Sequence, residues 1–222
     1  MRDAPRGRPN SFTQEPDTLA RELIDTVRRI SGRGWCDGTS GNYSVMVSRD
    51  PLRLLITPSG ADKGRVDTGD LLEVGADGRV LEDTPGRPSA ETLIHIALVR
   101  VAGAGAVLHT HSVWGTLLGE HFLTRGEFTL RGYEMLKGID GVTSHDAEVD
   151  VPIVANTQDM AALSNQVAGL VNADPGLRAF LIAGHGLYVW GRDVVQASRH
   201  VEIFEFLLQL VGRRVRLEPF DE

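Results

Sequence analysis

The sequence has few of the features that mark secreted, membrane-spanning or nucleic-acid-binding chains. Cys36 is the only cysteine among 222 residues. No disulfide can therefore form within the chain, and the expected location is the reducing cytoplasm. No apolar run approaches the roughly 20 residues that a membrane-spanning helix needs. Because no signal peptide is recognised either, we expect no membrane partner.

The charge balance argues against nucleic acid as a partner. The formal net charge is -7, whereas a nucleic-acid-binding domain usually shows an excess of lysine and arginine. The only dense basic run is Arg213, Arg214 and Arg216 near the C-terminus. Basic side chains in that position are typical of a solvated helix end, where they complement the helix dipole.

Length and composition predict one folded domain. An apolar fraction of 41% is typical of a globular protein, and 222 residues can enclose one sizeable core. Residues 1–16 are rich in Arg, Pro, Asn, Ser and Gln, which predicts a flexible N-terminal tail. We therefore predict a single domain over residues 17–216, followed by a short tail over 217–222.

Hydrophobic periodicity predicts alternating helices and strands. Helices are expected over 19–30 with Asp17 or Thr18 as the cap, from Ser89 onward, from 113, over 159–171 and over 193–211. Strands are expected over 43–47, 52–56, 71–74, 79–81, 106–108, 149–154, 179–183 and 187–190. Residues 132–136 fit neither pattern. The mixture indicates an α/β fold whose sheet is covered by helices and, because of its hairpins, is largely antiparallel.

Three of the seven histidines have unusual settings. His109 and His111 directly follow an apolar strand, and alternate residues of an extended segment point to the same side. His185 lies between two glycines at a sharp turn joining two β-prone runs. Three histidines with an open fourth position are typical of catalytic zinc. The alternatives are ordinary surface or core histidines and a plain glycine-rich turn.

The other four histidines have more ordinary settings. His95 and His200 lie on predicted helices, and His145 lies in a predicted loop. His121 follows His111 within a short distance along the chain. We expect all four to be packing or surface residues.

Three polar turns lie at the ends of predicted elements: residues 39–42, residues 57–60 and Ser89. Glycine frees backbone N–H groups to point at an anion, and a helix N-terminus adds positive potential. Lys63 is close enough in sequence to add charge. Together these turns are suited to a phosphate group, although each alone is equally typical of a cap or a β-turn.

Two carboxylates have candidate roles in proton transfer. Glu91 falls in the first turn of the helix expected from Ser89, where complementing the helix dipole would be a purely structural role. Glu134 stands between apolar neighbours. Such a setting predicts a raised pKa and proton transfer near neutral pH, whereas the alternative is a surface glutamate.

Five motifs occur in the order seen in class II aldolases. They are Thr-Ser-Gly-Asn at 39–42, Thr-Pro-Ser-Gly at 57–60, Ser-Ala-Glu at 89–91, His-Thr-His-Ser at 109–112 and Gly-His-Gly at 184–186. The stretches 103–112, 132–138 and 185–191 most resemble the dehydratases of that superfamily. The resemblance covers about residues 18–211 and is specific in the combination of its motifs.

The resemblance implies a three-layer αβα sandwich with a mainly antiparallel central sheet. It also implies a homotetramer with sites at the subunit interfaces, and a sugar-phosphate substrate. One Zn²⁺ per subunit would be held by His109, His111 and His185. Glu134 matches the acid/base of the dehydratases, and Glu91 matches that of the aldolases. The phosphate-binding positions that match are Gly41, Asn42, Ser59, Gly60 and Ser89. Ala90 replaces a serine that many aldolases carry.

The resemblance leaves other functions of the same fold open. A sugar-phosphate aldolase or a pentulose-phosphate 4-epimerase would use the same kind of site. A non-catalytic interaction module is a further alternative, but it would have no reason to keep three metal-ligand histidines.

Overall fold

A computed structural model describes residues 15–81 and 85–217 of the chain. Most of the predicted N-terminal tail and most of the predicted C-terminal tail lie outside these residues. Helix α1 runs from Pro16 to Gly32, so it begins at the last residue of the predicted tail. Proline occupies its first turn, where the missing N–H costs no hydrogen bond. The predicted cap at Asp17 or Thr18 is therefore wrong, because the N-cap is Glu15.

Eight strands form one sheet, in the order β3-β2-β1-β4-β8-β7-β6-β5. The strands are β1 (Asn42–Arg49), β2 (Leu52–Ile56), β3 (Leu72–Gly75), β4 (Ala106–Thr110), β5 (Glu127–Leu130), β6 (Val149–Val154), β7 (Ala179–Ile182) and β8 (Gly186–Gly191). Every neighbouring pair is antiparallel except β6 and β7. The prediction of a mainly antiparallel sheet is confirmed.

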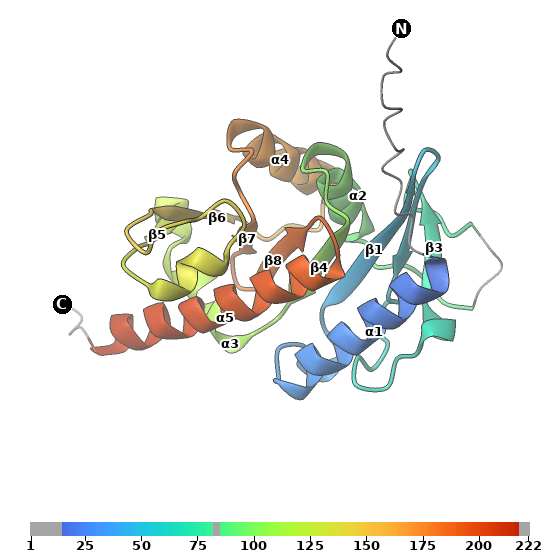
Figure 1. The fold of residues 1–222 in the computed structure, drawn as a ribbon, viewed down its shortest axis with the longest axis horizontal. Helices are drawn as coiled ribbons and strands as arrows, with labels where there is room; N and C mark the ends of the chain where they lie inside the picture. Colours follow the sequence, from blue (N-terminus) through green and yellow to red (C-terminus); the bar gives the residue numbers. More distant parts are fainter. Residues whose placement is uncertain (1–14, 82–84, 218–222) are drawn as a thin grey trace, which may run out of the picture.

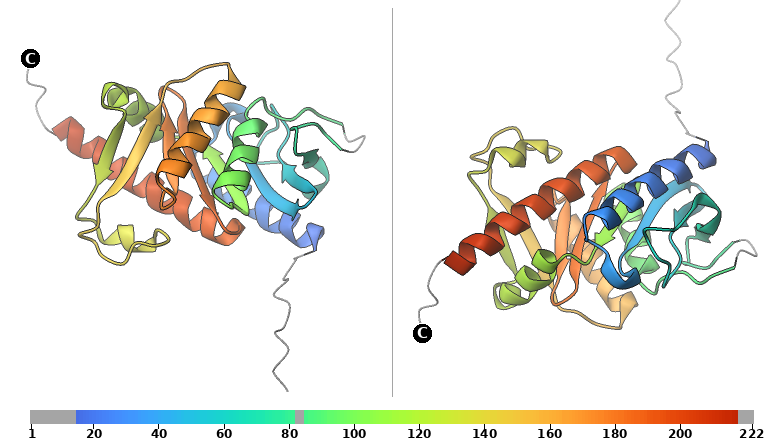
Figure 2. Two further views of the ribbon diagram at one scale, coloured as in Figure 1. Left: turned by 90° about the horizontal axis from the view of Figure 1, so that it is seen from above. Right: turned by 90° about the horizontal axis from the view of Figure 1, so that it is seen from below.

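Helices cover both faces of the sheet (Figures 1 and 2). Helices α1 and α5 (Val194–Leu217) pack on one face, and α2 (Thr92–Val101) and α4 (Met160–Ala173) pack on the other. Helix α3 (Val113–His121) packs against α5 and the adjoining strands. These three layers confirm the αβα sandwich. No helix within the described ranges combines the length and the apolar character needed to cross a membrane.

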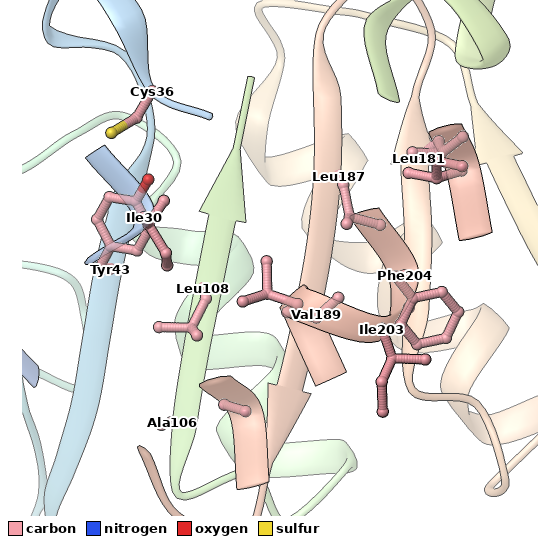
Figure 3. Close-up of a cluster of buried hydrophobic side chains, with 14 of the residues drawn as sticks. Ile30, Cys36, Tyr43, Ala106, Leu108, Leu181, Leu187, Val189, Ile203 and Phe204 are labelled. Carbon is pink, nitrogen blue, oxygen red and sulfur yellow. The ribbon is translucent and has the colours of Figure 1, made fainter. Parts of the chain in front are cut away.

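The two central strands are buried on both faces. On β8, Leu187 and Val189 point into the core under α1 and α5, which Figure 3 shows, while Tyr188 and Trp190 point into the core under α2 and α4. This division follows from the two-residue period of a strand. The sheet therefore holds the residues of β4 and β8 in a fixed position.

Two predicted elements differ from the structure. Residues 79–81 do not form a strand, because their pairing with β3 is a single bridge between Val74 and Val80. Helix α2 begins at Thr92 rather than at Ser89, because a turn precedes it. The unassigned stretch after β5 contains a 3-10 helix, η4 (Glu134–Gly138).

Candidate metal centre and adjoining loops

The sheet brings His109 and His111 together at the end of β4. His109 lies within the strand, is fully buried, and is paired with Asn42 of β1 on one side and Tyr188 of β8 on the other. Its ring stacks on Tyr188, with centroids 4.0 Å apart. His111 follows the strand, and the Nε2 atoms of the two histidines are 2.8 Å apart.

His185 reaches the same point from the turn between β7 and β8. Gly184 has φ +61°, and a Cβ on Gly186 would lie 2.0 Å from the carbonyl oxygen of Thr110. Glycine is therefore required at Gly186 for β8 to lie against the end of β4. His185 Nε2 lies 3.3 Å from His109 Nε2, and one ligand atom from each of the three histidines lies within 4.8 Å of the others.

The protonation of His109 fits a bound cation. Its Nδ1 donates to the carbonyl oxygen of Leu187 at 3.0 Å, so Nε2 presents a lone pair to the other two histidines. Burial and the neighbouring histidines hold the pKa of His109 well below its usual range. Burial, followed by the charge of His185, lowers the pKa of His111 to about 4. Both rings are thus neutral at pH 7, which is the form that binds metal ions.

Glu91 lies beside the three histidines. Its Oε1 is 3.3 Å from His185 Nε2, and its Oε2 is 3.8 Å from His109 Nε2. Glu91 occupies the N-cap position of α2, but its side chain makes no capping hydrogen bond. The carboxylate instead accepts a hydrogen bond from Asn42 Nδ2. The structure therefore uses Glu91 at the histidine cluster rather than to cap the helix.

Hydrogen bonds link the three polar turns to one another. Lys63 is buried, and its Nζ donates to the carbonyl oxygens of Thr39 and Ala61, which joins the first two turns. The amide of Ser59 donates to the carbonyl oxygen of Arg87, which joins the second turn to the segment leading to Ser89. The three turns are thus held together.

Individual turn residues differ in what they can offer an anion. Gly41 has φ +74°, and a Cβ there would lie 2.6 Å from the His109 carbonyl oxygen. The backbone of Gly41 therefore lies directly against the histidine strand. Gly60 has the same φ with open space around it. Ser89 Oγ accepts from the Glu91 amide, and the side chain of Asn42 is committed to buried partners.

Glu134 lies apart from the histidine cluster of its own chain. It begins η4, beyond the edge strand β5, which is three strands away from β8. Its side chain is 71% exposed, forms an ion pair with Lys137, and lies 3.9 Å from His145 Nδ1. The hydrogen bond from Lys137 lowers the pKa of Glu134. The expectation of an apolar setting and a raised pKa is therefore wrong for the single chain, because apolar neighbours in sequence do not bury the side chain.

Two further residues adjoin the histidine cluster and were not predicted from sequence patterns. His95 is completely buried and touches Asn42, although it was expected to be an ordinary packing residue. Its position four residues after Glu91 on one helix face was the available signal. Glu205 of α5 accepts a hydrogen bond from Thr110, which lies between His109 and His111 in the sequence, and no sequence pattern marks it. His200 does pack in the core, where it donates to the Trp190 carbonyl oxygen.

Comparison with known proteins agrees with this fold. The chain belongs to the class II aldolase and adducin N-terminal domain family, whose model matches residues 21–211. More particularly, it is similar to methylthioribulose-1-phosphate dehydratases. The protein of that name from Sorangium cellulosum is 43% identical over 192 residues, which is 86% of this chain and 90% of that protein. The one from Stenotrophomonas maltophilia strain R551-3 is 46% identical over 201 residues, covering 89% and 92% of the two chains.

Solved structures show the same fold. YgbL from Escherichia coli, described as a putative aldolase/epimerase/decarboxylase, superposes with a TM-score of 0.74 at 28% identity, covering 89% of each chain. An L-fuculose 1-phosphate aldolase superposes with a TM-score of 0.75 at 22% identity, covering 94% of this chain and 92% of that one.

Proposed function

We propose that the chain is a zinc-dependent hydro-lyase that removes water from 5-methylthioribulose 1-phosphate to give 2,3-diketo-5-methylthiopentyl 1-phosphate, a step of methionine salvage. The observation that carries this proposal is the cluster of His109, His111 and His185, which lies in a chain 43–46% identical to dehydratases of that name. A zinc ion held by these three side chains would supply Lewis acidity, which polarises a ketone and acidifies the neighbouring C–H.

The chain's own residues account for substrate binding and proton transfer. The turns containing Gly41, Ser59, Gly60 and Ser89 hold the phosphate and thereby fix the reacting carbons beside the histidines. Glu134 takes the proton from C3. The C4–O bond then breaks, and the hydroxyl leaves as water with that proton. The resulting enol rearranges to the second ketone. One carboxylate serves first as base and then as acid because the two steps are sequential.

Glu134 performs this role in the site of a neighbouring subunit. A general base must come within hydrogen-bond reach of its proton, and Glu134 lies far along the sheet from its own histidines. The exposed side chain of Met135 beside it fits a subunit contact. We therefore propose a homotetramer with one Zn²⁺ per subunit. The free, buried Cys36 thiol fits a reducing cytoplasm.

The first test is turnover of 5-methylthioribulose 1-phosphate by zinc-loaded protein, with formation of the diketone as the readout. We expect activity in the parent, its loss in Glu134→Gln with zinc retained, and normal activity in Glu148→Gln. Glu148 is the matched control, because it is also exposed and paired with a cation, Arg131. If zinc-loaded protein does not form the diketone, the proposed dehydratase activity is wrong. Cleavage or epimerisation of sugar phosphates would then identify an aldolase or an epimerase.

A second test addresses the shared site. Glu134→Gln and His185→Ala should each be inactive alone. Subunits of the two variants, exchanged at equal amounts, should regain about a quarter of the parent activity, because one site in four then combines an intact histidine set with an intact glutamate. Mixed tetramers without activity would show that Glu134 does not serve a neighbour.

A further inference from the structure

A buried line of hydrogen bonds leads from β1 through α2 to Glu91. Ser44 Oγ lies 2.7 Å from His95 Nδ1, and His95 Nε2 lies 2.5 Å from Asn42 Oδ1. Asn42 Nδ2 then donates to Glu91 Oε2. All four residues are buried, and Ser44 and His95 are 0% exposed. The proposed reaction gives His95 and Ser44 no part.

Glu91, the last residue of this line, determines which groups along it donate and which accept hydrogen bonds. The Glu91 carboxylate only accepts hydrogen bonds, so the Asn42 group that faces it must be the amide NH₂. The Asn42 oxygen therefore faces His95 and requires a donor there. Burial lowers the pKa of His95 to about 3, so the ring is neutral and carries one N–H. That hydrogen lies on Nε2, and Nδ1 accepts from the Ser44 hydroxyl.

The opposite direction would leave buried groups in conflict. Turning the Asn42 amide around would place its oxygen against the carboxylate of Glu91. It would also place its NH₂ against the N–H of His95 for as long as that hydrogen stays on Nε2. A buried polar group without a complementary partner costs roughly 1–3 kcal/mol. A hydrogen on His95 Nε2 thus complements the amide orientation that holds Glu91.

The line ends at the candidate metal centre. Glu91 Oε2 is held by Asn42, while Glu91 Oε1 is buried, makes no hydrogen bond within the described ranges, and lies 3.3 Å from His185 Nε2. The His95 ring also makes a T-shaped contact with Tyr188, at a centroid distance of 5.8 Å, and His109 stacks on the same tyrosine. His95 therefore touches the residues that support both Glu91 and His109.

We propose that His95 is a positioning residue, which acts through the Asn42 amide to hold the Glu91 carboxylate against the metal-ligand histidines. This inference rests on the proposed metal site. It also changes the role expected for Asn42, whose oxygen and one amide hydrogen are used within the protein. The Asn42 side chain thus mainly positions Glu91, and fewer of its hydrogen-bonding groups are left for a phosphate.

The test is binding of Co²⁺ alone, followed by its absorption spectrum in the metal-free protein. His95→Leu removes the donor, whereas in His95→Gln the side-chain amide can still donate to Asn42. We expect Co²⁺ to bind His95→Leu about 10- to 100-fold more weakly, the usual effect of losing such a supporting partner, and His95→Gln close to the parent. Glu91→Gln should be weakened similarly. The double variant His95→Leu/Glu91→Gln should be no weaker than Glu91→Gln, because His95 acts through Glu91.

His200→Leu is the matched structural control. His200 is also a fully buried histidine with two hydrogen bonds, to the Trp190 carbonyl oxygen and from the Asp140 amide, but neither partner adjoins the cluster. The His200→Leu variant should lose thermal stability and keep its affinity for Co²⁺. Equal weakening of Co²⁺ binding in His95→Leu and His200→Leu, or additive effects in the double variant, would overturn the positioning role.

A readout without metal separates this inference from the proposed function. Nitrogen NMR of histidine-labelled, metal-free protein should show His95 neutral, with its hydrogen on Nε2. Parent protein that binds no Co²⁺ would overturn the metal site, and the NMR result would then decide whether the line runs as described. A hydrogen on Nδ1, or a charged ring at pH 7, would refute it.

Discussion

Glu205 provides a prediction about stability whose size can be worked from the structure. The side chain lies on α5, is 3% exposed, and accepts a hydrogen bond from Thr110 Oγ1 at 2.5 Å. Burial raises the pKa of Glu205 from 4.5 to about 7, against a smaller opposing effect of hydrogen bonds from Ser112 and Thr110. The folded protein therefore retains a proton on this group at pH values where the unfolded chain has lost it.

The sign and the pH range follow from this difference. Since the folded state binds more protons between pH 4.5 and about 7, stability falls as the pH rises through that range. The difference of about 2.5 pH units, at about 1.4 kcal/mol per unit, corresponds to about 3 kcal/mol above pH 7 and to nothing below pH 4.5. Glu205→Gln stays neutral, keeps an oxygen for Thr110, and removes this loss.

We expect Glu205→Gln to unfold at nearly the parent temperature at pH 5. At pH 8 it should unfold roughly 6–12 °C higher, since each kcal/mol shifts the midpoint of a chain of this size by about 2–4 °C. Thermal unfolding would be followed at pH 5, 6, 7 and 8 with a chelator present, so that bound metal does not contribute. Glu202→Gln on the same helix is the control, because Glu202 is only half-buried and is paired with Arg33. A difference in unfolding temperature between variant and parent that does not change with pH would refute the reasoning. A variant less stable than the parent at pH 8 would refute it as well.

Three further substitutions and one chemical labelling experiment have expected outcomes. Gly60→Ala should cost about 1–2 kcal/mol of unfolding free energy, because φ is +74° there. Gly41 has the same φ, but Gly41→Ala should lower the thermal unfolding midpoint clearly more, because the added methyl would lie 2.6 Å from the His109 carbonyl oxygen. Equal losses of stability in the two variants would show that this contact relaxes. His185→Ala should remove stoichiometric zinc, measured by elemental analysis, and a full zinc content would exclude His185 as a ligand. Cys36 should react far more slowly with a thiol reagent in the folded than in the unfolded protein, because the thiol is buried and burial raises its pKa; equal rates would contradict its burial.

Strands bounded by turns were predicted best. The ranges 52–56 and 149–154 match β2 and β6 to the residue, because each is a short β-prone run between turn residues. The start of α2 was placed three residues too early, since Ser89 fits a cap in sequence but forms a turn in the structure. The strand over 79–81 failed because local alternation does not determine how far a hairpin pairs.

The candidate site was predictable where the signal was local. The two-residue spacing of His109 and His111, and the glycines around His185, are properties of short segments, and the structure brings the three rings together. The surroundings of Glu134 and His95 were not predictable in this way. Exposure of Glu134 depends on how η4 lies on the surface, and burial of His95 depends on β1, about 50 residues earlier, packing over α2.

The pairing of β4 with β8 has a consequence for folding. His109 faces Tyr188 in one exact register, and His185 enters from the turn that begins β8, 74 residues after His111 along the chain. A slip of one residue would turn His109 to the opposite face of the sheet. The three nitrogens therefore come together only when two distant segments have paired correctly, so metal uptake during refolding would report completion of the central sheet rather than the formation of any local element.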